Sequence, residues 1–157
     1  MKKLKEYVTE GVFDIDNNIK NIDKYIKSQI KQFLKDNFKG YSNCKINTKP
    51  NSDGKYEVSC SGDIEVKNKK IVSLTNGRFI WSEVAGSFNC WDCCSLTSLE
   101  GAPKEVGNIF NCGCCGSLTS LKGAPQKTGH FICRGCGSEF TKDDVKKISN
   151  VKWSIIA

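Results

Sequence analysis

The spacing of apolar residues predicts that the first 41 positions are helical. Apolar side chains recur three or four residues apart and lysines lie away from them, which is typical of a helix with one buried face. The apolar set is Ile19, Ile22, Ile26, Ile30, Phe33 and Leu34. We expect a short helix over residues 2–10 that stops at Gly11, followed by a connector over residues 12–16. A longer helix is expected over residues 18–39, with Gly40 as its C-terminal stop.

Alternation of apolar and polar residues replaces the helical spacing in residues 42–61. Two short alternating runs begin at Cys44 and at Tyr56, and a turn sequence that contains Gly54 lies between them. This pattern predicts a β-hairpin. In its strands Cys44 and Cys60 are expected to be small apolar side chains.

The rest of the chain repeats itself with a period of about 22 residues. Residues 95–103 return as residues 117–125, both with the pattern Ser-Leu-Thr-Ser-Leu-x-Gly-Ala-Pro. A single turn of chain cannot bury its Phe, Cys and Leu side chains, but turns stacked about 4.8 Å apart can. A fixed period with Leu-x-x-Leu spacing therefore predicts a leucine-rich-repeat-like β-solenoid. The turns are expected to centre near Ile64, Phe88, Phe110, Phe131 and Trp153.

The repeated segment also resembles a known family. Its sequence Ser-Leu-Thr-Ser-Leu-Glu-Gly-Ala-Pro-Lys-Glu-Val-Gly, followed by Phe-Asn-Cys-x-x-Cys, is similar to leucine-rich-repeat-like proteins encoded by tailed bacteriophages, over about residues 62–139. The resemblance implies a phage protein that acts in a bacterial host as a binding scaffold, and it carries over no catalytic residue. The chain departs from the family pattern in its few repeats, in an insertion at residues 78–81, and in cysteines at the usual asparagine positions. Those cysteines are Cys93, Cys115 and Cys136.

Together these patterns predict an α+β fold: a short leucine-rich-repeat-like β-solenoid with caps at both ends. The segments are an N-terminal helical segment (1–41), a hairpin cap (42–61), the repeat array (62–138) and a C-terminal helix and strand cap (139–157). In the last segment Thr141 is expected to begin a short helix, with Asp144 bonding back to it. Val145 and Ile148 are then expected to press that helix on the last turn of the solenoid.

The ten cysteines leave two alternatives open. Three Cys-x-x-Cys pairs recur with the repeat, so most of their sulfur atoms are expected inside the solenoid, and no cofactor is then needed. The same spacing is also a good zinc spacing, in which Cys112, Cys115, Cys133 and Cys136 supply four thiolates. Cys94 and Cys114 fall off the repeat ladder and are expected to be exposed. Disulfides are the less favoured state, because no secretory signal is visible.

Charge and composition narrow the function classes. Residues 1–80 hold 16 basic and 10 acidic side chains, whereas residues 81–157 hold 8 and 7, so the repeat array is almost neutral. A duplex-binding surface would need a basic stripe there. No apolar stretch approaches the ~20 residues of a membrane span. His130 is the chain's one histidine, and no set of nucleophile, base and orienting group can be assembled around it, so we expect no enzyme.

We therefore expect a cytoplasmic, non-catalytic scaffold that binds a protein of the bacterial host. One such role is the inhibition of a host anti-phage defence complex, for example a CRISPR-type complex. The alternatives are a zinc-stabilised nucleic-acid-binding module and a virion-associated accessory protein. The candidate binding residues are the outward strand residues Asn89, Asn111 and Ile132, with Glu65 beside them, the exposed aromatics Trp81 and Trp91, and the helix lysines Lys24, Lys27 and Lys31.

Overall fold

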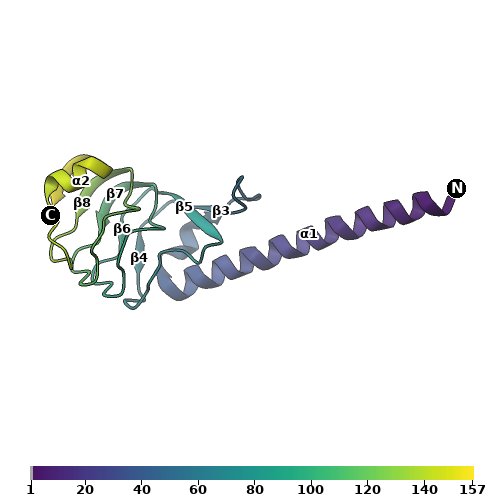
Figure 1. Cartoon of the computed structure of the whole chain (residues 1–157), viewed down its shortest axis with the longest axis horizontal. Coiled ribbons are helices and arrows are strands. Elements are labelled where there is room, and N and C mark those ends of the chain that lie inside the picture. The colour runs from purple at the N-terminus through teal and green to yellow at the C-terminus, as the bar shows by residue number, and fades with distance from the viewer. Residues whose placement is uncertain (1) are drawn as a thin grey trace.

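A computed structural model describes the backbone of residues 2–157 and the side chains of residues 17–157. The chain forms a β-solenoid of about four turns with a long N-terminal helix and a small C-terminal helix. Figure 1 shows the N-terminal helix extending away from the solenoid, with the two termini at opposite ends of the molecule. The coarse architecture of the sequence prediction is thus confirmed.

The N-terminal helix α1 is one continuous element, Lys2–Asn37. The expected break after residue 10 is wrong, because a lone Gly11 weakens a helix by only about 1 kcal/mol relative to alanine and does not end it. The helix stops at Asn37, close to the predicted end. Gly40 follows in the left-handed region with φ 81°, and a Cβ there would meet the Asp63 carbonyl oxygen. Only glycine fits this position.

The hairpin forms as predicted. A short strand β1 (Phe38–Lys39) and a 3-10 turn η1 (Tyr41–Asn43) precede it, and strands β2 (Cys44–Ile46) and β3 (Tyr56–Cys60) pair antiparallel. In this register Cys44 lies opposite Cys60, with their Cα atoms 4.1 Å apart, and the two sulfur atoms form a disulfide. The expectation of two separate apolar thiols is therefore wrong, because direct cross-strand neighbours are within disulfide reach.

The solenoid is built from parallel strands in a nine-stranded sheet. The strands after the hairpin are β4 (Ile64–Val66), β5 (Phe79–Val84), β6 (Phe88–Asn89), β7 (Glu105–Asn111), β8 (Lys127–Ile132) and β9 (Asn150–Ile156). Residues in register across β4, β6, β7, β8 and β9 are Ile64, Phe88, Phe110, Phe131 and Ile155. The first four are the predicted turn centres. The fifth is Ile155 and not Trp153. At Lys127 and Asn150 the two strands are already 23 residues apart, and a bulge in β9 raises the offset to 24 at Phe131 and Ile155, so Trp153 does not take the interior position that a 22-residue period gives it.

Aromatic rings and sulfur atoms share the interior. The Phe110 ring lies between those of Phe88, 5.9 Å away, and Phe131, 5.2 Å away, and all three side chains are fully buried. The inserted residues 78–81 are explained by β5, which pairs parallel with β3 and places Trp81 beside Val58. The expectation that Trp81 is exposed is wrong. Trp81 is 1% exposed, and its Nε1 donates to the Leu74 carbonyl oxygen over 3.0 Å.

Charge pairs also connect neighbouring turns. The Lys127 ammonium lies 2.8 Å from the Glu105 carboxylate on the turn below, at equivalent repeat positions. Lys122 and Glu100 repeat this arrangement at 2.7 Å. Both pairs are exposed, so each adds little to stability.

Helices cover the two ends of the solenoid. Ile30 and Leu34 of α1 are buried at the N-terminal end. The short helix α2 (Lys142–Ile148) has the predicted capping box between Thr141 and Asp144, and its Val145 is buried, whereas Ile148 remains 39% exposed. Within residues 2–157, no helix is both long and apolar enough to cross a membrane.

Candidate functional site

The predicted outward row forms on the sheet. Asn89, Asn111 and Ile132 lie in register with Glu65, and all four are half-buried. The Asn89 Oδ1 accepts a hydrogen bond from the Trp91 backbone N–H, and the Asn111 Oδ1 accepts one from that of Gly113. Each asparagine thus holds the turn that follows its strand, which gives this row a structural use.

Trp91 is exposed beside that row, as expected, with 46% of its surface accessible. The Lys69 ammonium donates to the Trp91 carbonyl oxygen over 2.7 Å and lies 5.9 Å from the centre of the indole ring. A neighbouring cation of this kind holds the ring by a cation–π contact. Because Lys69 holds the ring in place while about half of its surface stays exposed, Trp91 is available to a partner.

The three predicted helix lysines do not act together. Lys27 is half-buried against the hairpin, where its ammonium donates to the Thr48 carbonyl oxygen and lies 5.1 Å above the Tyr56 ring. Lys24 and Lys31 are exposed. Lys27 therefore attaches α1 to the hairpin, and the expected basic face is reduced.

The Cys-x-x-Cys pairs point into the solenoid. The Cys115 sulfur donates to the Cys90 carbonyl oxygen and the Cys136 sulfur to that of Cys112, both over 3.2 Å, so each satisfies the backbone of the preceding turn. Burial raises the pKa of Cys133 to about 11, which favours the thiol over the metal-binding thiolate. Among the residues whose side chains are described, no three His, Cys, Asp or Glu groups are arranged to hold a metal ion. The zinc set Cys112, Cys115, Cys133 and Cys136 is therefore not gathered around a common centre.

Two thiols lie outside this ladder. Cys94 and Cys114 are exposed, as predicted. Asp92 and Cys114 occupy equivalent left-handed positions in successive repeats, with φ 58° and 57°. The Cys94 sulfur lies 3.3 Å from the Asp92 carboxylate, and this hydrogen bond raises the pKa of Cys94 above its usual value. Neither thiol is activated for nucleophilic chemistry by a neighbouring base.

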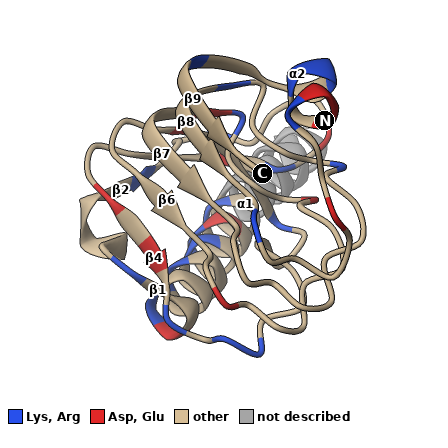
Figure 2. Cartoon of the chain, turned by 90° about the vertical axis from the view of Figure 1, so that its left-hand side faces the viewer, with Lys and Arg blue, Asp and Glu red and all other residues tan. Residues whose placement is uncertain are grey.

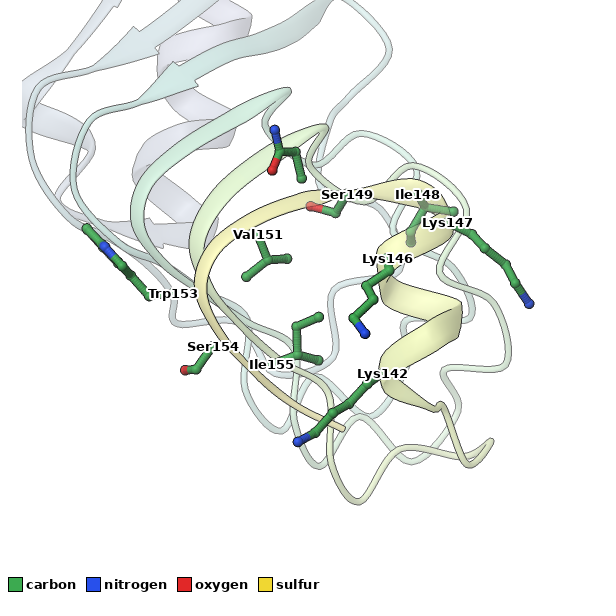
Figure 3. A pocket seen from close by; sticks show the side chains of 10 residues that line it. Lys142, Lys146, Lys147, Ile148, Ser149, Val151, Trp153, Ser154 and Ile155 are labelled. Atoms are coloured by element: carbon green, nitrogen blue, oxygen red, sulfur yellow. The ribbon is translucent and has the colours of Figure 1, made fainter.

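A concave surface lies at the C-terminal end of the solenoid. A hollow of about 710 Å³ opens between α2 and β9. Val151 and Ile155 of β9 form its apolar floor, and the half-exposed Ile148 stands at its rim (Figure 3). We call this hollow the C-terminal groove. Its lining residues are Lys142, Lys146, Lys147, Ile148, Ser149, Asn150, Val151, Trp153, Ser154 and Ile155.

One buried polar group lines the C-terminal groove without a partner. Ser149 is only 5% exposed, and its hydroxyl makes no hydrogen bond within the described structure. Leaving a buried hydroxyl unpaired costs about 1–3 kcal/mol.

Trp153 forms one side of the groove. It is 53% exposed and its ring lies over Gly129, where a Cβ would come within 2.3 Å of the indole. The His130 ring is 5.0 Å away and the Lys152 ammonium lies 4.9 Å from the indole centre. A second hollow, of about 340 Å³, adjoins the other side of the indole. Trp153 is therefore an exposed aromatic anchored over β8, and its side chain points away from α2 (Figure 3).

The outer edge of β9 is open as well. Within residues 2–157, β9 pairs only with β8. An edge strand presents a row of unpaired N–H and C=O groups, which can accept a further strand. The C-terminal groove thus combines free main-chain groups, an apolar floor and an exposed indole.

The sequence prediction missed this site. The 22-residue period placed Trp153 in the solenoid interior, but the offset from β8 to β9 is 23 residues before the bulge in β9 and 24 residues after it. The available signal was chemical, since Trp153 is the one tryptophan near a run of four lysines, Lys142, Lys146, Lys147 and Lys152.

Comparisons of the chain with protein-family models, with curated proteins and with solved structures found no match.

Proposed function

We propose that the protein is a non-catalytic scaffold that binds an extended segment of a partner protein at its C-terminal groove. The observation that carries the proposal is the unpaired edge of β9 beside the half-exposed Trp153. A segment that adds as a strand gains main-chain hydrogen bonds from the edge, and pockets for its alternate side chains give specificity. The apolar floor and the hollow beyond Trp153 are such pockets.

The charge of the groove points to an acidic segment. Lys142, Lys146 and Lys147 lie along α2, and Lys152 stands beside Trp153. Figure 2 looks onto this end of the molecule and shows the basic positions of α2 at its margin. Lys146 and Lys147 are each 3.4 Å from an aspartate of their own helix, whereas Lys142 and Lys152 make none of the ion pairs found among the described residues. Complementary charge speeds encounter and excludes wrong partners.

The resemblance of the repeats to those of phage-encoded proteins suggests where the partner comes from. We infer that the partner is a protein of the bacterial host and that the meeting place is the host cytoplasm. Holding an extended segment of a defence complex in the C-terminal groove would inhibit that complex without any chemistry. This part of the proposal is supported by the repeat sequence at residues 95–103 and 117–125.

The two exposed tryptophans allow a matched test. The protein is immobilised, a host lysate is passed over it, and the captured species is identified and its affinity measured for the Trp153→Ala and Trp91→Ala variants. We expect Trp153→Ala to weaken binding by about 30-fold or more, as for a central aromatic anchor worth about 2 kcal/mol, and Trp91→Ala to leave it nearly unchanged. Far-ultraviolet circular dichroism checks that both variants fold.

Three results would count against the proposal. Loss of binding with Trp91→Ala alone would move the docking site to the row of Asn89 and Asn111. Capture of DNA or RNA without protein, with a steep dependence on salt, would favour nucleic-acid binding. One zinc ion per chain, with unfolding by a chelator, would favour the zinc module.

A further inference from the structure

Among the residues whose side chains are described, three large apolar side chains of α1 lie exposed where the helix projects from the solenoid. Ile19 and Ile22 are 53% and 57% exposed, and Tyr25 is 59% exposed. From Ile26 onward the solenoid takes over, because Ile26 is half-buried and Ile30 fully buried. The apolar spacing of the helix therefore continues beyond the surface that the solenoid covers (Figure 1). Large exposed apolar side chains in a row mark an interaction surface.

The spacing of the apolar residues along α1 indicates that its partner is another helix. Apolar residues recur at intervals of four, three, four, three and four over the list Val8, Val12, Ile15, Ile19, Ile22 and Ile26. This alternation is the heptad pattern of a coiled coil, in which two positions in seven face the partner helices. A surface helix that only packed on its own domain, or lay on a membrane, would need a broader apolar face and no strict seven-residue period. We call these six positions the heptad stripe.

The charges lie where a coiled coil needs them. Lys20 and Lys24 fall at outer heptad positions, so they would not face one another across the seam. Asp23 lies to one side of the stripe, and its carboxylate accepts a hydrogen bond from the Tyr56 hydroxyl of the hairpin. The contact between α1 and the solenoid takes in Ile26, the last residue of the stripe, and leaves Ile19 and Ile22 exposed.

We propose that α1 joins copies of this chain into a parallel, three-stranded coiled coil through the heptad stripe. All six stripe residues are β-branched, and isoleucine-type residues at both core positions favour three or more strands over two. A parallel bundle places the solenoids together at the C-terminal end of the helices. Because the C-terminal groove lies at the far end of each solenoid, all three grooves stay accessible (Figure 1).

Sedimentation equilibrium of the full chain tests this proposal. We expect a mass of about three times the chain mass of 17.4 kDa at high protein concentration, with dissociation on dilution because the stripe is short. The double variant Ile19→Lys/Ile22→Lys should be monomeric. The matched control Asn17→Lys/Asn21→Lys adds the same charge at exposed positions outside the stripe and should remain a trimer.

Circular dichroism and Trp81 fluorescence confirm that each variant retains its solenoid. A monomeric wild-type chain, or a stripe variant that keeps the wild-type mass, would overturn the proposal. A stripe-dependent dimer would overturn the three-stranded assignment. Binding of the wild-type monomer to anionic lipid vesicles would assign the stripe to a membrane surface instead. None of these results bears on the C-terminal groove, so the two proposals stand or fall separately.

Discussion

The central turn of the solenoid offers the sharpest test of its packing. Phe110 is fully buried, with the Phe88 ring on one side and the Phe131 ring on the other. We expect Phe110→Ala to lower the free energy of unfolding by about 4–5 kcal/mol. Removing a buried phenyl group costs ~3–5 kcal/mol in lost transfer energy and cavity formation. The value should lie in the upper half of that range, because each aromatic pair adds about 0.5–1.5 kcal/mol and this ring belongs to two.

The measurement is equilibrium unfolding in urea, followed by tryptophan emission. Trp81 is buried, whereas Trp91 and Trp153 are about half exposed, so Trp81 supplies most of the change on unfolding. With a slope of about 2 kcal/mol per molar urea, the midpoint should fall by roughly 2 M. Phe110→Leu keeps most of the volume but loses both aromatic pairs, so it should lose about 1–3 kcal/mol, less than Phe110→Ala.

The control lies on the same strand. Asn108 is exposed on β7, so Asn108→Ala should change the stability by no more than about 0.5 kcal/mol. A loss below about 1.5 kcal/mol for Phe110→Ala would refute the reasoning. It would mean that neighbouring turns are not stacked closely enough to enclose the ring.

Four further predictions concern the charge pairs, the thiols, Tyr56 and the disulfide. Lys127→Glu should cost about 0.5 kcal/mol in urea unfolding by placing a third carboxylate beside Glu83 and Glu105, which lie opposite each other on β5 and β7, and adding Glu105→Lys should recover the loss; a double variant no better than the single one would argue against the pairing. Asp92→Asn should speed the reaction of Cys94 with a thiol reagent at pH 8, because the Asp92 carboxylate raises the pKa of that thiol; a slower reaction would contradict this. Burial and the hydrogen bond to Asp23 raise the pKa of Tyr56 to about 12, so its stabilising contribution should be complete below pH 10 and lost as the pH rises toward 12. In an absorbance titration, one tyrosine should ionise at a higher pH than the others, and Tyr56→Phe should remove that step. Reduction of the Cys44–Cys60 disulfide, whose residues are 16 positions apart, should lower the free energy of unfolding by about 3 kcal/mol in the chain-entropy account, and Cys44→Ser/Cys60→Ser should be insensitive to reductant.

The architecture was readable from the sequence because the solenoid repeats its own chemistry. Phe88, Phe110 and Phe131 recur at the repeat period, and a stack in which each turn covers the next is the simplest way to bury all three. The capping box at Thr141 was equally readable, because its signal is local. Features of this kind depend on residues close in sequence or on an exact repeat.

The wrong predictions concern residues whose positions depend on contacts outside the repeat or on small departures from it. Trp81 is buried by β3, a strand outside the repeat array, so no repeat comparison could place it. The disulfide depends on the hairpin register. Cys44 and Cys60 lie equally far from the turn, and this symmetry could have predicted that they pair. Trp153 was misplaced because the last turn is two residues longer than the 22-residue period, and the bulge in β9 accounts for only one of them.

The near-identical turns also allow the length of the solenoid to change in fixed steps. Because residues 95–103 and 117–125 occupy equivalent places in successive turns, duplicating or deleting one 22-residue unit would leave both capped ends chemically unchanged. Each such unit would alter the separation between α1 and the C-terminal groove by one strand spacing, about 4.8 Å. Related genes that differ in copy number would therefore produce the same two ends at graded distances, fitted to targets of different size.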